Sequence, residues 1–179
     1  MGAQLWHHET PWNDDPATAL QTLQAEFAPP DVVAELIQNQ LKGQREHAQF
    51  LVEDGDEFGL LEDVRLIISY LEQISKLPVP NDPASRVALV RNIHNRQGDE
   101  VGNVLDVLGT SDSREHRHAQ ILTPEEIQKF CSTSQPTKAQ AMEAISNINT
   151  DLDRAEAVCF PFYEGGSPTG WHFVGNTAD

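Results

Sequence analysis

Apolar residues in the first half of the chain recur every three or four positions, the spacing of a helix with one buried face. The longest stripe runs from Val32 to Val52 and follows Asp31, a residue suited to capping a helix. A second stripe runs from Leu60 to Ile74 and ends before a proline-rich segment. Because only a short acidic segment separates them, the two stripes predict an antiparallel helical hairpin.

Shorter helices are predicted before and after this hairpin, because the chain carries further start signals. Aspartate followed by proline favours a helix start, and threonine followed three residues later by glutamate forms a capping box. With the hairpin, these signals predict four to six helices. The start signals are Asp15 with Pro16, Asp82 with Pro83, Thr123 with Glu126, and the segment 135–137.

The C-terminal segment has the clearest strand pattern in the chain. Residues 157–163 and 170–174 are rich in aromatic and β-branched residues and flank a glycine-rich turn, which predicts a β-hairpin. We expect its first strand to be buried on both faces, while Pro161 indicates that part of one edge lacks a neighbour. Other short segments that fit strands are 3–8, 102–109 and 114–122.

Together these elements predict the α+β class, with the helices packed on a small antiparallel sheet that includes the C-terminal hairpin. A length of 179 residues and an apolar fraction of 39% suit one compact core, so we expect residues 1–179 to form a single globular domain. The sequence contains no long apolar run, and Cys131 and Cys159 cannot form a disulfide framework. We therefore expect a cytoplasmic protein without membrane contact.

The chain is strongly acidic, with 28 acidic and 12 basic residues and a formal net charge of −16. This charge disfavours direct binding of nucleic acids, which needs clustered lysine and arginine, and it disfavours anionic membranes for the same reason. It favours a basic protein partner, since opposite charges speed encounter. The densest acidic run begins after the first long helix and extends into the start of the second, and it comprises Glu53, Asp54, Asp56, Glu57, Glu62 and Asp63.

From this charge pattern we predict an acidic protein-binding module rather than an enzyme. Inhibitors and immunity proteins, which cover the basic cleft of a nuclease or another toxin, have this physical character. The expected contact residues are the six acids of the run and Trp12, which lies in a polar loop between prolines. A permanent subunit of a larger assembly would show the same sequence features.

The alternative is a metal-dependent enzyme, either a hydrolase or an oxygenase. His116 and His118 are separated by one residue, and in a strand both rings would project to one face, which suits zinc or iron. Many such histidine pairs are simply solvated, and the usual zinc-binding spacings do not occur in the sequence. A third ligand would have to come from elsewhere, such as His7, His8 or Glu115.

Other catalytic patterns are missing from the sequence. It contains no Gly-x-Ser-x-Gly or Ser-x-x-Lys motif and no glycine-rich loop between a strand and a helix. Cys159 lies in a strand that we expect to be buried, whereas Cys131 follows a helix end and could be exposed. Neither thiol is a persuasive nucleophile, so the sequence nominates no catalytic residue.

Overall fold

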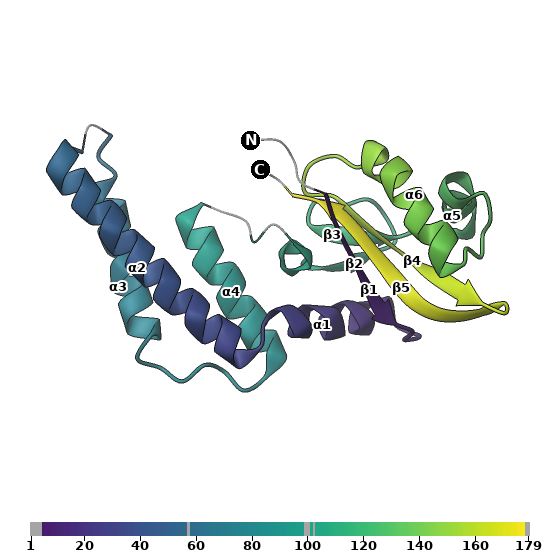
Figure 1. Ribbon diagram of the computed structural model, residues 1–179, viewed down its shortest axis with the longest axis horizontal. Coiled ribbons are helices and arrows are strands. Elements are labelled where there is room, and N and C mark those ends of the chain that lie inside the picture. Colours follow the sequence, from purple (N-terminus) through teal and green to yellow (C-terminus); the bar gives the residue numbers. More distant parts are fainter. Residues whose placement is uncertain (1–4, 57, 99–100, 102, 178–179) are drawn as a thin grey trace. The chain divides into compact units, whose positions relative to one another are not determined.

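The computed structural model describes residues 5–56, 58–98, 101 and 103–177. Contacts divide the chain into two compact units (Figure 1). Unit 1 comprises residues 1–27 and 100–179, and unit 2 comprises residues 28–99. Unit 2 is thus inserted into the sequence of unit 1, and the expectation of a single domain stays a prediction.

Unit 1 is built on a five-stranded mixed sheet with the strand order β1-β5-β4-β3-β2. The pairs β1–β5 and β5–β4 are antiparallel, whereas β4–β3 and β3–β2 are parallel. The predicted C-terminal hairpin is confirmed as β4 and β5, and its turn is tighter than expected, with only Gly165 and Gly166 between the strands. The strands are β1 (Leu5–Pro11), β2 (Gly109–Ser111), β3 (His118–Ile121), β4 (Ala157–Glu164) and β5 (Ser167–Asn176).

The prediction of an antiparallel sheet was wrong, because the sheet is mixed. Between β3 and β4 the chain forms α5 (Pro124–Cys131) and α6 (Lys138–Asp151). A helical crossover of this kind brings the chain back to the starting end of the sheet, so the next strand runs parallel. Because β3 pairs only with residues 157–159 of β4, Pro161 lies where that edge has no partner strand, as predicted.

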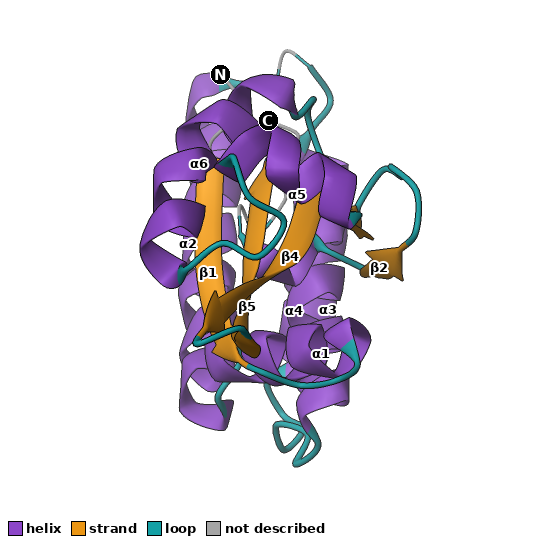
Figure 2. Ribbon diagram, turned by 90° about the vertical axis from the view of Figure 1, so that its right-hand side faces the viewer, coloured by secondary structure: helices purple, strands orange, loops and turns teal. Residues whose placement is uncertain are grey.

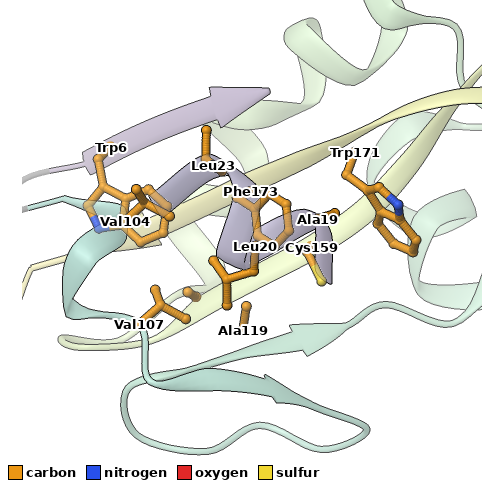
Figure 3. Packing of buried hydrophobic residues seen from close by; sticks show 11 residues of the cluster. Trp6, Ala19, Leu20, Leu23, Val104, Val107, Ala119, Cys159, Trp171 and Phe173 are labelled. Carbon is orange, nitrogen blue, oxygen red and sulfur yellow. The ribbon is translucent and has the colours of Figure 1, made fainter. Parts of the chain in front are cut away.

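The sheet is buried on both faces because side chains alternate along β4 and β5. One face carries Cys159 and Phe173 and is covered by α1 (Pro16–Phe27) and the 3-10 helix η1 (Val104–Asp106) (Figure 3). The opposite face carries Phe160 and Val174, and α5 and α6 cover it (Figure 2). The predicted burial of β4 on both sides is therefore confirmed.

Unit 2 consists of three helices, α2 (Pro30–Asp54), α3 (Leu61–Ile74) and α4 (Pro83–Gln97). The helices α2 and α3 run side by side in opposite directions and form the predicted hairpin (Figure 1). Their buried side chains repeat at helical spacing, as the apolar stripes indicated. The buried apolar residues of the three helices are Val33, Ile37, Leu41, Leu51, Val64, Leu71, Val87, Val90 and Ile93.

Most of the predicted helix starts are confirmed by side-chain hydrogen bonds. The Asp82 carboxylate accepts from the Ser85 N–H, and the Thr123 hydroxyl accepts from the Glu126 N–H. The prediction that Asp31 caps α2 was wrong, because this helix starts at Pro30 and has no side-chain cap. A proline in the first turn needs no such cap for its own nitrogen, which carries no hydrogen. In the described part of the chain, no helix is long and apolar enough to cross a membrane.

Candidate functional site

The acidic run lies at the end of the helical hairpin where α2 ends and α3 begins. Asp54 is the last residue of α2, and Glu62 and Asp63 lie in the first turn of α3. Asp56 has a structural role, because its carboxylate accepts hydrogen bonds from the N–H groups of Leu60 and Leu61 at 2.6 and 3.0 Å. Glu57 lies outside the described residues. The run thus provides exposed carboxylates around a loop, and Asp56, which belongs to the run, stabilises that loop.

Large apolar side chains are exposed in the same segment, a feature that our reading of the sequence missed. Phe58 is 83% exposed, and Phe50, Val52 and Leu66 are between 57% and 63% exposed. An isolated exposed apolar residue needs no explanation, but a group of them beside charged groups is typical of an interaction surface. We call the following residues the hairpin tip: Phe50, Val52, Glu53, Asp54, Phe58, Leu60, Glu62, Asp63 and Leu66.

A groove of about 500 Å³ begins at the hairpin tip and lies within unit 2. Its tip side is formed by Leu60, Asp63 and Leu66. On the other side, the Gln44 side-chain N–H donates to the amide oxygen of Gln97 at 3.3 Å. The remaining side-chain oxygen of Gln44 and nitrogen of Gln97 are buried without a partner among the described residues. The groove therefore combines apolar walls with polar groups, as ligand-binding clefts do.

Trp12 belongs to unit 1 and is less exposed than we expected. It is half-buried and stacks on Trp171, with the ring centroids 5.1 Å apart. Its indole N–H donates to the Asp14 carboxylate at 3.0 Å. These contacts fix the ring against the core of unit 1, whereas the acidic run belongs to unit 2. The structure therefore gives Trp12 a packing role, and its role in partner binding stays a prediction.

The structure places His116 and His118 at the start of β3 but not together on one strand face. The strand begins only at His118, and the intervening Arg117 has a left-handed backbone with φ of +60°. The Nδ1 atom of His118 lies 3.9 Å from the Glu115 carboxylate. Within the described residues, neither histidine belongs to a group of three side chains with ligand atoms close enough for one ion. Metal binding by this pair stays a prediction.

A second cluster is formed by His7 and Glu9 on β1 with His172 on β5. Alternation along β1 places the first two on one face, and the strand register sets Glu9 opposite His172. The His7 Nε2 atom lies 2.8 Å from the His172 Nδ1 atom, which in turn lies 3.9 Å from a Glu9 carboxylate oxygen. In the described part of the chain, this group is the one whose ligand atoms all lie within 4.8 Å of one another.

The surroundings of this cluster keep both imidazoles neutral at pH 7. His172 is fully buried, and its ring packs against Phe160 and Phe162 with centroid distances of 5.5 and 4.8 Å. Burial lowers the pKa of His172 to about 4, and the nearby His7 adds to the effect. Burial also lowers the pKa of His7, although the Glu9 carboxylate opposes this. Neutral imidazole is the form that binds a metal ion.

The two cysteines are both free thiols, and both are buried. Cys159 packs in the core below α1, as expected for the central strand. Cys131 is only 8% exposed, so the expectation that it could be exposed was wrong. It turns into the core between α5, α6 and the sheet, where burial raises its pKa to about 11. At neutral pH neither thiol supplies the thiolate that nucleophilic catalysis needs.

No protein-family model, curated protein or solved structure matches the chain. The fold and the two candidate sites define a class only: an α+β protein with an acidic, partly apolar helical hairpin and a buried cluster of two histidines and a glutamate.

Proposed function

We propose that this protein is an acidic protein-binding module whose hairpin tip docks on a basic surface of another protein. The observation that carries the proposal is that exposed apolar side chains and exposed carboxylates lie together at one end of the hairpin. Protein interfaces combine apolar anchors at their centre with a polar rim. In this module Phe58 and Leu66 are the anchors, and Glu53, Asp54 and Glu62 belong to the rim.

The carboxylates of the hairpin tip can meet basic groups of a partner, although that of Glu53 also accepts a hydrogen bond from the Gln49 side-chain amide at 2.7 Å. Further along the hairpin, Glu72 already pairs with Arg45 at 2.6 Å, and Glu46 pairs with Lys42 at 3.9 Å. None of the ion pairs in the described part of the chain involves Asp54, Glu62 or Asp63. The net charge of −16 adds a long-range field of the same sign, which speeds encounter with a basic protein.

The partner that fits this surface is a protein with a positive cleft, such as a nuclease or another toxin. A helical hairpin end with exposed negative charges can enter a cleft that is built to bind a polyanion. Charge complementarity of this kind determines which partner is selected and how quickly it binds, while the buried apolar anchors slow dissociation. The form of the module that we propose is therefore an inhibitor or immunity-type protein.

The proposal is tested with two variants that lose the same number of negative charges at different places. The tip variant carries Glu53→Gln, Asp54→Asn, Glu62→Gln and Asp63→Asn. The control variant carries changes at four exposed acids of unit 1 that form no ion pair with any described residue: Asp112→Asn, Glu125→Gln, Glu143→Gln and Glu164→Gln. Both are used as bait in cells that make the protein, and native mass spectrometry identifies the bound species.

We expect the unmodified protein and the control variant to retain the same basic protein in a complex of fixed stoichiometry. The tip variant should retain at least about tenfold less, since each interfacial charge pair is worth roughly 1 kcal/mol or more. Raising the salt concentration should weaken the complex. The proposal fails if the captured protein is acidic, if no partner is retained, or if the tip variant and the control variant behave alike.

A second comparison tests the apolar anchors. Phe58→Ser and Leu66→Ser remove exposed side chains of the hairpin tip, while Leu108→Ser removes a side chain of unit 1 that is 52% exposed. With the captured partner, the tip changes should increase the dissociation rate, and the control change should not. Equal dissociation rates for all three variants would show that the tip contributes no apolar contact.

A further inference from the structure

We propose that His7, Glu9 and His172 form a binding site for a divalent metal ion of the zinc type. Two imidazole nitrogens and one carboxylate are ligands that zinc accepts, and the same set occurs around other first-row transition metals. The site is separate from the hairpin tip, because all three residues belong to unit 1. It also differs from the site that the sequence suggested, which was centred on the His116 and His118 pair.

The distances need only a small adjustment to admit an ion. In a tetrahedral zinc site, bond lengths of about 2.0 to 2.1 Å place two nitrogen ligands about 3.3 Å apart. The facing nitrogens of His7 and His172 are 2.8 Å apart, so they must separate by about half an ångström. The Glu9 carboxylate oxygen lies 3.9 Å from His172 Nδ1, which is close to the separation between two ligands of one ion.

The protons of the imidazole pair can be accommodated without losing any. Each neutral ring carries one proton, and one of them now lies between the two facing nitrogens. For both facing nitrogens to bind an ion, that proton must leave the shared position. Where His7 is the donor, its ring takes a proton on Nδ1 instead, while His172 keeps its proton on Nε2, a buried atom without a partner among the described residues. Both rings then stay neutral, and the ion displaces a hydrogen bond rather than a charge.

The position of the cluster on the sheet supports its use as a binding site. β5 lies between β1 and β4, so His172 is held from both sides by strand pairing. The rings of Phe160 and Phe162 form an apolar wall behind it. His7 and Glu9 are half-buried and leave the site open to solvent on the side of β1. Ligands fixed on neighbouring strands, with an apolar shell behind them, need little reorganisation to bind an ion.

Lys138 at the start of α6 provides a specific test of the metal site, because it contacts one of the three ligands. Its ammonium group pairs with the Glu9 carboxylate, so it competes with a cation for that ligand. Replacing Lys138 removes both the competitor and a positive charge from the neighbourhood of the site. A metal site therefore predicts that Lys138→Met binds the ion more tightly, which a purely structural cluster does not predict.

The experiment is a calorimetric titration of the metal-free full chain with zinc. We expect one equivalent to bind, with affinity reduced at least about tenfold by His7→Ala and by Glu9→Gln. Lys138→Met should increase the affinity several-fold, and Lys129→Met, which changes a lysine of α5, should leave it unchanged. The double change of His116→Ala with His118→Ala should also leave it unchanged.

Circular dichroism first establishes which variants fold. NMR of the unmodified protein needs no variant: zinc should shift the ring signals of His7 and His172 while those of His116 and His118 stay in place. The proposal is overturned if no zinc binds, if His7→Ala and Glu9→Gln bind it as tightly as the unmodified protein, or if the double change at 116 and 118 abolishes binding.

Discussion

Trp6 and Gly175 face each other directly across the pair of strands β1 and β5, and the Trp6 indole covers the place where a side chain at position 175 would begin. A β-carbon there would lie 2.6 Å from the Cε2 atom of the indole, well inside contact distance. The absence of a side chain at 175 is therefore what lets Trp6 reach the core below α1. This contact joins the first strand of the chain to the last.

We expect Gly175→Ala to destabilise the protein by about 1 to 3 kcal/mol, because the indole or the strand must move. Urea unfolding followed by circular dichroism, to which both units contribute, measures the change. Gly43→Ala is the control, since Gly43 lies in α2 with open space around its α-carbon. That change should be neutral or stabilising by up to about 1 kcal/mol, because alanine favours helix. Equal effects of the two changes would contradict the packing described here.

Arg86 supports a second prediction, which concerns unit 2. It is buried, and its guanidinium donates hydrogen bonds to the backbone oxygens of Ala28, Pro80 and Asn81 at 2.6, 3.2 and 2.5 Å. These bonds join the start of unit 2 to the loop before α4. Arg86→Met keeps the apolar part of the side chain but leaves the three carbonyls without this donor.

The expected loss for Arg86→Met is about 2 to 4 kcal/mol, since hydrogen bonds to charged groups are among the stronger ones. The helical signal in circular dichroism during chemical denaturation reports it. Arg65→Met, at an exposed position of α3, should change the stability by less than about 0.5 kcal/mol. A loss below 1 kcal/mol for Arg86→Met would show that water replaces the guanidinium at little cost.

Much of the helical structure was predictable because its signals are local. The apolar stripe of α2 and α3, the Asp82 cap and the Thr123 capping box each need only a few neighbouring residues, and the structure contains all of them. Asp31 shows the limit of such signals. The helix already starts at Pro30, with Pro29 in the cap position, so the aspartate lies two positions too late to cap it.

The sheet and the histidine cluster were harder to predict, because they depend on contacts between distant residues. His7 and His172 are 165 positions apart, and only the β1–β5 register brings them together. The sequence suggested His7 only as a possible third ligand for the His116 and His118 pair, and the predicted strand 3–8 ended before Glu9. The parallel direction of β3 and β4 has the same origin, since it follows from the helical crossover between them and not from their own short patterns.

Asp56 is an acid of the run whose carboxylate holds the loop of the hairpin in place. Its two carboxylate oxygens accept from the N–H groups of Leu60 and Leu61, which would otherwise lack a partner at the start of α3. We expect Asp56→Ala to lower stability by about 1 kcal/mol, as the loss of a helix cap does. Asp54→Ala, which removes an exposed acid nearby, should change it by less than about 0.5 kcal/mol. Thermal melting distinguishes the two, and equal effects would contradict the assignment of Asp56.

Cys131 makes stability depend on pH in the alkaline range. Burial raises its pKa from an ordinary value of 9.0 to about 11, so the folded state holds the thiol proton more tightly than the unfolded state does. Below pH 9 both states keep the proton, and the group contributes nothing to the pH dependence. Between pH 9 and about 11 the unfolded state loses its proton first, so the free energy of unfolding must fall as the pH rises.

Comparing the unmodified protein with Cys131→Ala isolates this effect, since Cys159 and all other groups titrate in both proteins. At pH 7 the variant should be the less stable one, because it loses buried contacts of the sulfur. As the pH rises from 9 towards 11, the unmodified protein should lose on the order of 2 kcal/mol more than the variant. Urea unfolding under reducing conditions at several pH values measures the gap. Parallel curves for the two proteins would mean that the Cys131 thiol ionises in the folded state as readily as in water, and hence that it is not buried as the structure shows.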